Sequence, residues 1–212
     1  MSDETLLSAA RPLPAAITGR LRQQLDFIIE CDRMKAIIRR SPLAVADRRE
    51  NDAEHSWHLA LMVILLAEYA DTPIDVGHTV ELVVVHDLIE IYAGDTPLYD
   101  LAGAADQAER EEAAADRLFA LLPADQAVHL RALWDEFEER KTPEAKFAKA
   151  MDRFQPDLMN WMAGGGTWQT PGITASMVRE RKYAIPEASA VIGEASADII
   201  DAAEQRGWIR PD

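Results

Sequence analysis

The segment from Val80 to Tyr92 carries an adjacent histidine and aspartate, His86 and Asp87, within the most apolar part of the chain. Burying such a pair among aliphatic side chains costs several kcal/mol unless its charges are matched. The three valines at 83–85 favour a strand, but the segment of about thirteen residues is long for one, and Gly94 is a good helix terminator. We therefore predict a buried helix, with other charged groups or a cation lying against it.

The remainder of the chain shows the three- and four-residue spacing of apolar side chains that is typical of helices. One helix is predicted from Ile17 onward, and a second begins at Asn51 or Asp52, either of which can cap the free amides of residues 53–55. Further helices are predicted over residues 105–122, 124–140, 143–162 and 186–206, with a proline near the start of the last three. The sequence shows no alternating strand pair with a hairpin turn and no internal repeat. We predict an all-α protein with one helical-bundle domain over residues 16–210, after a loose lead-in over residues 1–15.

The overall charge limits the class of partner. The chain has 22 Lys and Arg residues against 37 Asp and Glu residues, a formal charge of −15 at pH 7. This balance argues against broad electrostatic binding to a nucleic-acid polymer or an anionic membrane. The longest uninterrupted apolar stretch, Leu59 to Ala67, has nine residues, and a membrane-spanning helix needs about twenty. Cys31 is the only cysteine and no secretory signal is visible, so we expect a cytoplasmic protein without disulfides or cysteine-based zinc sites.

One segment reverses the acidic balance. Residues 33–49 contain six basic residues and a single acid, Asp47, which gives a local charge of +5. The segment leads directly into the helix that carries His55, so we expect it at the mouth of any site there. Arginine side chains bind phosphate oxygens in bidentate fashion. A small phosphorylated ligand is therefore compatible with the acidic chain, although the same arginines could instead form a solvated surface that pairs with acids.

Four places in the sequence hold potential metal ligands. These are His55 in the first turn of its helix, the adjacent His86 and Asp87, and Asp152 in the predicted helix over residues 143–162. Two imidazoles and two carboxylates form a mixed nitrogen and oxygen set that suits Mn²⁺, Co²⁺, Fe²⁺ or Zn²⁺ without selecting among them. The alternative for each residue is a hydrogen-bonded position in the core, which is common for a single His or Asp on an apolar helix.

The larger pattern resembles the HD-domain metal-dependent phosphohydrolases, and within them the 5′-deoxynucleotidase-like branch. The resemblance rests on Asn-Asp-Ala-Glu-His-Ser at 51–56, His-Asp-Leu-Ile-Glu at 86–90, Gly-Asp-Thr-Pro at 94–97 and Ala-Met-Asp-Arg at 150–153. It spans most of the chain and includes the order and spacing of all four ligand positions. It implies an HD-domain helical bundle and one divalent metal ion (Mn, Co, Fe, Zn or Mg) bound by His55, His86, Asp87 and Asp152.

The same resemblance implies roles for other residues. Glu90 corresponds to the family's essential acidic residue, and it is expected on the same helix face as His86, as a general base or an orienting group for water. Asp95 corresponds to a residue near the sugar and the attacking water. Arg40 falls on the family's phosphate-contacting arginine. Ser41 departs from the pattern, because it stands where the branch has a tryptophan that helps to exclude the ribose 2′-hydroxyl, so the sugar preference stays open.

The expected activity is hydrolysis of nucleoside 5′-monophosphates to nucleoside and phosphate, with deoxynucleotides the first to test. One alternative is an HD hydrolase of another phosphorylated metabolite, such as an alarmone. Another is a nucleotide- or metal-binding regulatory protein with little turnover. We expect a small phosphorylated substrate, no nucleic-acid polymer and no membrane as partners, and a homodimer.

Overall fold

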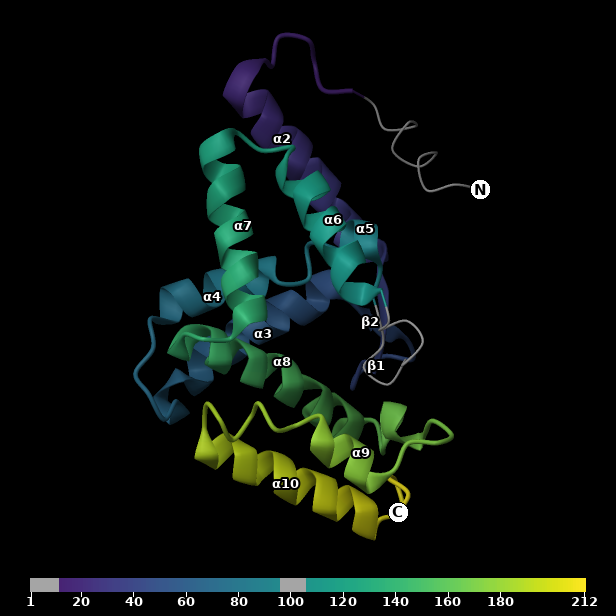
Figure 1. Ribbon diagram of the computed structural model, residues 1–212. Coiled ribbons are helices and arrows are strands. Elements are labelled where there is room, and N and C mark those ends of the chain that lie inside the picture. Colours follow the sequence, from purple (N-terminus) through teal and green to yellow (C-terminus); the bar gives the residue numbers. More distant parts are fainter. Residues whose placement is uncertain (1–11, 96–105) are drawn as a thin grey trace.

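The structure is a computed structural model that describes residues 12–95 and 106–212 (Figure 1). The helices are α2 (Gly19–Cys31), α3 (Asp52–Leu66), α4 (Val76–Val85), α5 (Glu90–Ala93), α6 (Gln107–Phe119), α7 (Ala124–Glu139), α8 (Pro143–Met162), α9 (Ala175–Glu180) and α10 (Ala190–Gln205). Short 3₁₀ turns η1 (Asp32–Ala36), η2 (Ala67–Tyr69) and η3 (Gly166–Gln169) and two strands, β1 (Ile38–Pro42) and β2 (Arg49–Asn51), complete the described elements. The prediction of an all-α fold is confirmed.

Helix starts follow the capping residues in the sequence. The Asn51 side chain accepts a hydrogen bond from the Glu54 amide, and the Glu54 side chain accepts one from the Asn51 amide, so α3 begins with a complete capping box. Thr142 caps α8, and Pro143 occupies its first turn. These signals fix the starts of α3 and α8 where the sequence predicts them, and α8 has the predicted bounds of 143–162.

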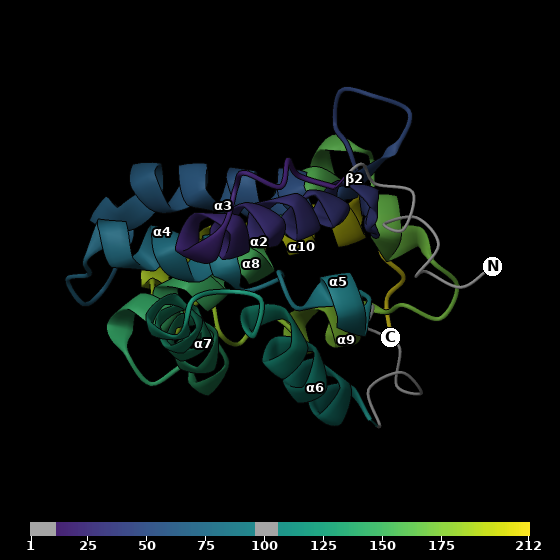
Figure 2. The ribbon, with the colours of Figure 1, turned by 90° about the horizontal axis from the view of Figure 1, so that it is seen from above.

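Helix α8 is the centre of the molecule. It contacts α3, α4, α7 and α10, and α10 lies along it at the lower edge of Figure 1. Figure 2 shows α6 and α7 along one side of the molecule and α3 along the other. The main apolar core joins α3, α4, α6, α7 and α8, while a second cluster packs the C-terminal part around Trp168, Val178 and Ile200. Side chains on α8 can therefore meet groups from both the central and the C-terminal helices.

The predicted continuous helix from Val80 to Tyr92 is wrong in one respect, because α4 ends at Val85 and α5 begins at Glu90. Between them the amides of Leu88 and Glu90 donate to carbonyls three residues back, a tighter winding than that of an α-helix. At three residues per turn, Asp87 and Glu90 lie on one side. Glu90 lies beside Asp87 and Asp52, and its place on the face of His86 stays a prediction.

The structure also contains an antiparallel strand pair that the sequence did not predict. β1 and β2 pair Ile38 with Asn51 and Pro42 with Arg49, with an irregular register between the two pairs. A loop longer than the common two-residue hairpin turn joins them, and β1 does not alternate apolar and polar side chains. The pair therefore lacks the local pattern by which hairpins are recognised.

The remaining differences lie toward the ends of the chain. Helix α9 was not predicted, and the helix predicted over 186–206 begins at Ala190, where the Ser189 side chain caps it. Most of the predicted lead-in lies outside the described residues. Among the described residues, we find no helix with both the length and the apolar character needed to cross a membrane.

Candidate metal centre

Three of the four predicted ligands, His55, His86 and Asp152, offer ligand atoms that lie within 4.8 Å of one another, and Asp87 lies beside them. His55 on α3 places Nε2 3.2 Å from Asp152 Oδ1 on α8 and 4.0 Å from Asp87 Oδ2. His86 places Nε2 3.0 Å from Asp87 Oδ1 and 3.9 Å from Asp152 Oδ1. All four residues are buried, with His55 fully enclosed. The ligand atoms of His55, His86 and Asp152 thus face a shared centre, whereas Asp87 also belongs to a second group of carboxylates with Asp52 and Glu90.

The hydrogen bonds of His86 fit a cation at that centre. Its Nδ1 lies 2.8 Å from the Val83 carbonyl oxygen, to which only a protonated nitrogen can donate. In the neutral ring, Nε2 then carries a lone pair. This buried nitrogen lies 3.0 Å from Asp87 Oδ1 but makes no hydrogen bond of acceptable geometry with it or with any other described residue. A lone pair that faces carboxylate oxygens is repulsive unless a positive charge lies between them. The donor set therefore suits a divalent metal ion.

A carboxylate on β2 lies close to the second ring nitrogen of His55. Glu50 Oε2 lies 3.5 Å from His55 Nδ1, and the Gln155 side chain donates to Glu50 Oε1 at 2.7 Å. A metal-binding imidazole commonly directs its second nitrogen at such a carboxylate, which fixes the ring and raises its basicity. Glu50 was missed in the sequence, where the only hint is an acid that directly precedes the α3 cap.

A second group of acids lies next to the four ligands. Asp52, Asp87 and Glu90 offer carboxylate oxygens within 4.8 Å of one another. Arg39 on β1 enters this group, with Nη1 2.7 Å from Asp87 Oδ2 and 3.3 Å from Asp52 Oδ1. The predicted basic segment therefore does reach the site, but the arginine that contacts the acids is Arg39, which the sequence did not single out from its neighbours.

Burial and charge shift the acids in opposite directions. Burial opposes ionisation of Asp87 and Asp152, yet His86 and Arg39 lower the pKa of Asp87, and Lys149 and His55 lower that of Asp152. Burial and the neighbouring Asp87 raise the pKa of Asp52 to about 6 and raise that of Glu90 well above its usual range. The surroundings thus favour the ionised form of Asp87 and Asp152 and disfavour that of Asp52 and Glu90.

The imidazole of His55 titrates under competing influences. Its burial and the Arg39 charge disfavour protonation, but the contacts with Asp152 and Glu50 outweigh them and raise the pKa of His55. The cluster of carboxylates therefore attracts positive charge to this ring. A bound cation would take the place of that proton.

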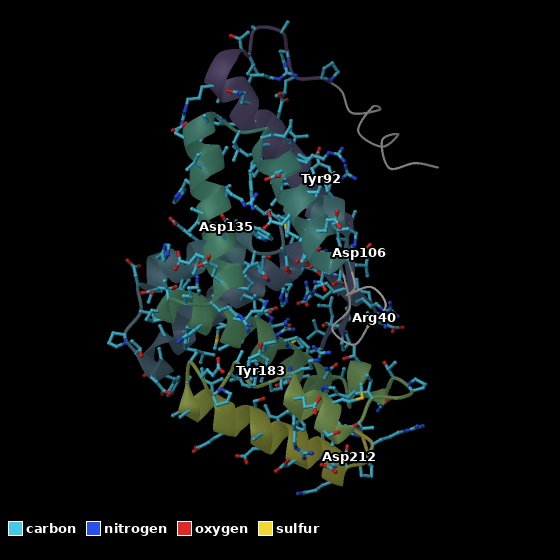
Figure 3. All side chains as sticks on the ribbon, viewed as in Figure 1. Arg40, Tyr92, Asp106, Asp135, Tyr183 and Asp212 are labelled. Atoms are coloured by element: carbon cyan, nitrogen blue, oxygen red, sulfur yellow. The ribbon has the colours of Figure 1, made fainter. Side chains whose placement is uncertain are left out.

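A pocket opens beside Asp152. Its cationic lining comes from Arg39 and Arg40 on β1 and from Arg153 and Lys182, and Asp95 also faces it. Figure 3 shows Arg40 at the hairpin side of the molecule. Arg40 is exposed, and the described residues offer it no ion pair. The structure thus brings Arg40 and Asp95 to the pocket, and Glu90 to the acids behind it.

Comparisons with known proteins show the family of the chain. Residues 31–191 match the HD domain family, a span of more than half of the chain. The chain belongs to the HD domain family. The family resemblance read from the sequence is thereby confirmed.

Relatives of this HD-domain chain include proteins with an assigned activity in their names. The bovine protein named 5′-deoxynucleotidase HDDC2 is 30% identical over 149 residues, which cover 69% of this chain and 71% of that protein. The human protein of the same name is 32% identical over 106 residues and matches over only 50% of its length.

Solved structures give the same fold. A predicted metal-dependent phosphohydrolase from Magnetospirillum magnetotacticum MS-1 is 46% identical, with a TM-score of 0.86 over 91% of this HD-domain chain and 96% of that one. A conserved hypothetical protein from Pyrococcus furiosus is 20% identical with a TM-score of 0.59, over 85% of this chain and 99% of that one, and shares the fold alone.

Proposed function

We propose that the chain uses one divalent metal ion, held by His55, His86, Asp87 and Asp152, to hydrolyse nucleoside 5′-monophosphates, with deoxynucleotides the first candidates. The observation that carries this proposal is the convergence of His55, His86 and Asp152, with Asp87 beside them, next to a pocket lined by four cationic side chains. The names of the relatives, 5′-deoxynucleotidase and predicted metal-dependent phosphohydrolase, support the same reaction class.

The cationic side chains have two different roles, at the metal centre and at the substrate phosphate. A divalent cation at this donor set would lower the pKa of water and polarise a phosphoryl oxygen. Arg39 neutralises Asp87 and Asp52, so its charge serves the centre itself. Arg40 and Arg153 line the pocket and can bind the phosphate dianion.

Two acids take the proton and sugar roles in this proposal. Burial and the neighbouring Asp87 raise the pKa of Glu90 well above its usual range, so its carboxyl accepts a proton more readily than that of an exposed glutamate. Asp95 lines the pocket, where burial also raises its pKa, and it is the acid that a sugar hydroxyl can reach. Glu90 thus acts on water, and Asp95 positions the nucleoside.

A second copy of the chain is the proposed macromolecular partner. The outer face of α3 exposes four large apolar side chains at helical spacing, namely Trp57, Leu61, Ile64 and Leu65. An apolar stripe of this kind is typical of an interaction surface. We assign it to a homodimer, the oligomer expected from the sequence.

The decisive experiment measures phosphate release from deoxy- and ribonucleoside monophosphates, each with Mn²⁺, Co²⁺, Mg²⁺ and Zn²⁺. Metal-dependent release that Glu90→Ala removes supports the proposal. Undiminished release by Glu90→Ala would assign the activity to a contaminant or another site.

The other two functions predict different results in the same experiment. Release of phosphate from an alarmone, but from no monophosphate, identifies a hydrolase of another metabolite. A metal-loaded protein that binds nucleotide and releases no phosphate from any substrate is a regulatory binder.

A further inference from the structure

The lining of the pocket includes a side-chain amide whose orientation is fixed. Asn160 on α8 is only 2% exposed, and it lines the pocket together with Pro156 and Trp168. The amide and the hydroxyl of Thr167 lie 2.8 and 3.0 Å from the same side-chain atom of Asn160. Because a backbone N–H can only donate, that atom is the oxygen Oδ1.

The amide nitrogen of Asn160 is left without a partner. Both of its side-chain hydrogen bonds within the described chain end on Oδ1, and none involves Nδ2. Nδ2 is not fully enclosed by protein atoms, so it retains accessible surface. Since Asn160 lines the pocket, Nδ2 is a hydrogen-bond donor available to a pocket ligand.

The backbone N–H of Thr167 holds the amide in this orientation, because a turned-over amide would place Nδ2 against another donor. Gly166 has a φ of +47°, and a Cβ at this position would collide with Asn160 Oδ1 and with Pro42. The close approach allowed by glycine holds η3 against the oxygen side of the amide. The donor side therefore stays directed away from η3.

The spacing along α8 separates this donor from the metal centre by about the distance between the phosphate and the base of a nucleotide. Asp152, Pro156 and Asn160 follow one another at four-residue intervals and lie along one face of the helix. Eight residues of α-helix rise about 12 Å, which is comparable to the length of a nucleoside monophosphate. A phosphate beside Asp152 and Arg153 thus leaves the base at Asn160, with the sugar beside Pro156.

We propose that Asn160 reads the base of the substrate and that its Nδ2 selects bases with a ring carbonyl over bases with an amino group at the same position. This inference rests on the proposed nucleotidase function and adds a specificity to it. Guanine O6 and the O4 of thymine or uracil accept a hydrogen bond, whereas adenine N6 and cytosine N4 donate one. A donor fixed in the pocket favours the first group and repels the second.

Two size-matched substrate pairs test the proposal. In the metal-loaded wild type, kcat/KM for dGMP over dAMP and for dUMP over dCMP is expected to exceed one by roughly 2- to 10-fold, as for one neutral hydrogen bond. Asn160→Asp keeps an oxygen for Thr167 and replaces the donor with an acceptor, so both ratios are expected to fall and to invert. Asn160→Ala removes the donor without a new acceptor, and both ratios are expected to approach one.

Gln169→Glu supplies the matched control. It makes the same amide-to-carboxylate change in η3, on an exposed side chain that bonds the Gly164 carbonyl and does not line the pocket. Its two ratios are expected to equal those of the wild type. Wild-type ratios at or below one, or unchanged ratios in both Asn160 variants, would overturn the proposal.

A binding measurement separates this inference from the proposed function. Calorimetric titration with deoxyguanosine and deoxyadenosine needs no turnover and no phosphate. Tighter binding of deoxyguanosine that Asn160→Ala abolishes supports the base site even if no nucleotide is hydrolysed. Equal binding, or no binding of either nucleoside, counts against the base site and leaves the phosphohydrolase proposal to its own experiment.

Discussion

Arg39 Nη1 lies 2.7 Å from Asp87 Oδ2, so a guanidinium from the hairpin neutralises a carboxylate of the candidate metal centre. The same nitrogen lies 3.3 Å from Asp52, which is fully buried. Although burial opposes its charge, the surrounding carboxylates raise the pKa of Arg39 further above its already high value. The arginine and a bound cation would thus together offset the free-energy penalty of burying these carboxylates.

Arg39→Ala is expected to lower the free energy of unfolding of the metal-free protein by about 3–5 kcal/mol, because it leaves buried carboxylates uncompensated. Mn²⁺ should raise Tm more in this variant than in the wild type, since the cation supplies part of the missing charge. Arg48→Ala, which breaks the exposed pair with Glu54, is the control and should change stability by less than about 1 kcal/mol. An equal Mn²⁺ effect on Tm in Arg39→Ala and wild type would contradict the charge-sharing explanation.

Removal of divalent cations is expected to lower Tm. A ligand at about 100 times its Kd stabilises the folded state by about 2.7 kcal/mol, which thermal denaturation with and without EDTA would detect. Asp152→Asn retains the shape of the side chain but weakens the donor set, so its Tm should respond little to Mn²⁺. If Mn²⁺ raised the Tm of Asp152→Asn as much as that of the wild type, the cation would bind elsewhere.

Arg40→Ala is expected to reduce kcat/KM for a nucleoside monophosphate by about 10- to 100-fold, the effect of losing a hydrogen bond to a charged group. Its Tm should stay near the wild-type value, because Arg40 is exposed and the described residues give it no ion pair. Arg40→Lys should restore part of the loss, since the charge returns without the bidentate geometry. Steady-state kinetics with unchanged KM and kcat in Arg40→Ala would exclude the phosphate contact.

Lys182 and Asp157 form a buried ion pair that fastens the C-terminal segment to α8. Lys182 Nζ lies 2.6 Å from Asp157 Oδ1 and donates to the Arg153 carbonyl oxygen, next to Asp152. Lys182→Met should cost about 3–5 kcal/mol in urea denaturation, because Asp157 is left buried and unpaired. Combining it with Asp157→Asn, which still accepts from Ser196, should recover most of the loss. Simple additivity of the two changes would show that the pair does not act as a unit.

Ile64→Glu on α3 is expected to convert a dimer into a monomer, as measured by light scattering after size exclusion. Ile64 is 59% exposed in the single chain, so the change should leave the fold intact. Val128→Glu on α7 introduces the same charge at another exposed apolar position and should not change the mass. A monomeric wild type, or a dimeric Ile64→Glu, would exclude the α3 face as the interface.

The sequence by itself determined the elements whose signals are local. The capping box at Asn51 and the Thr142-Pro143 pair set the starts of α3 and α8, because each cap acts within one turn of helix. The chemistry of the candidate ligands was also readable, since His86 and Asp87 cannot be buried in an apolar segment without a charged partner.

Only the tertiary structure decided which groups meet. Arg39 reaches Asp87 across 48 residues, His55 reaches Asp152 across 97, and Glu50 meets Gln155 across 105. No local propensity encodes such pairings, because they depend on how α3, α4, α8 and the hairpin pack together. The tight turn at 86–89 likewise precedes Glu90, whose carboxylate lies beside Asp87 and Asp52, a grouping that the sequence did not predict. Local signals act over a few residues, and the site is built from charges that only packing brings within reach.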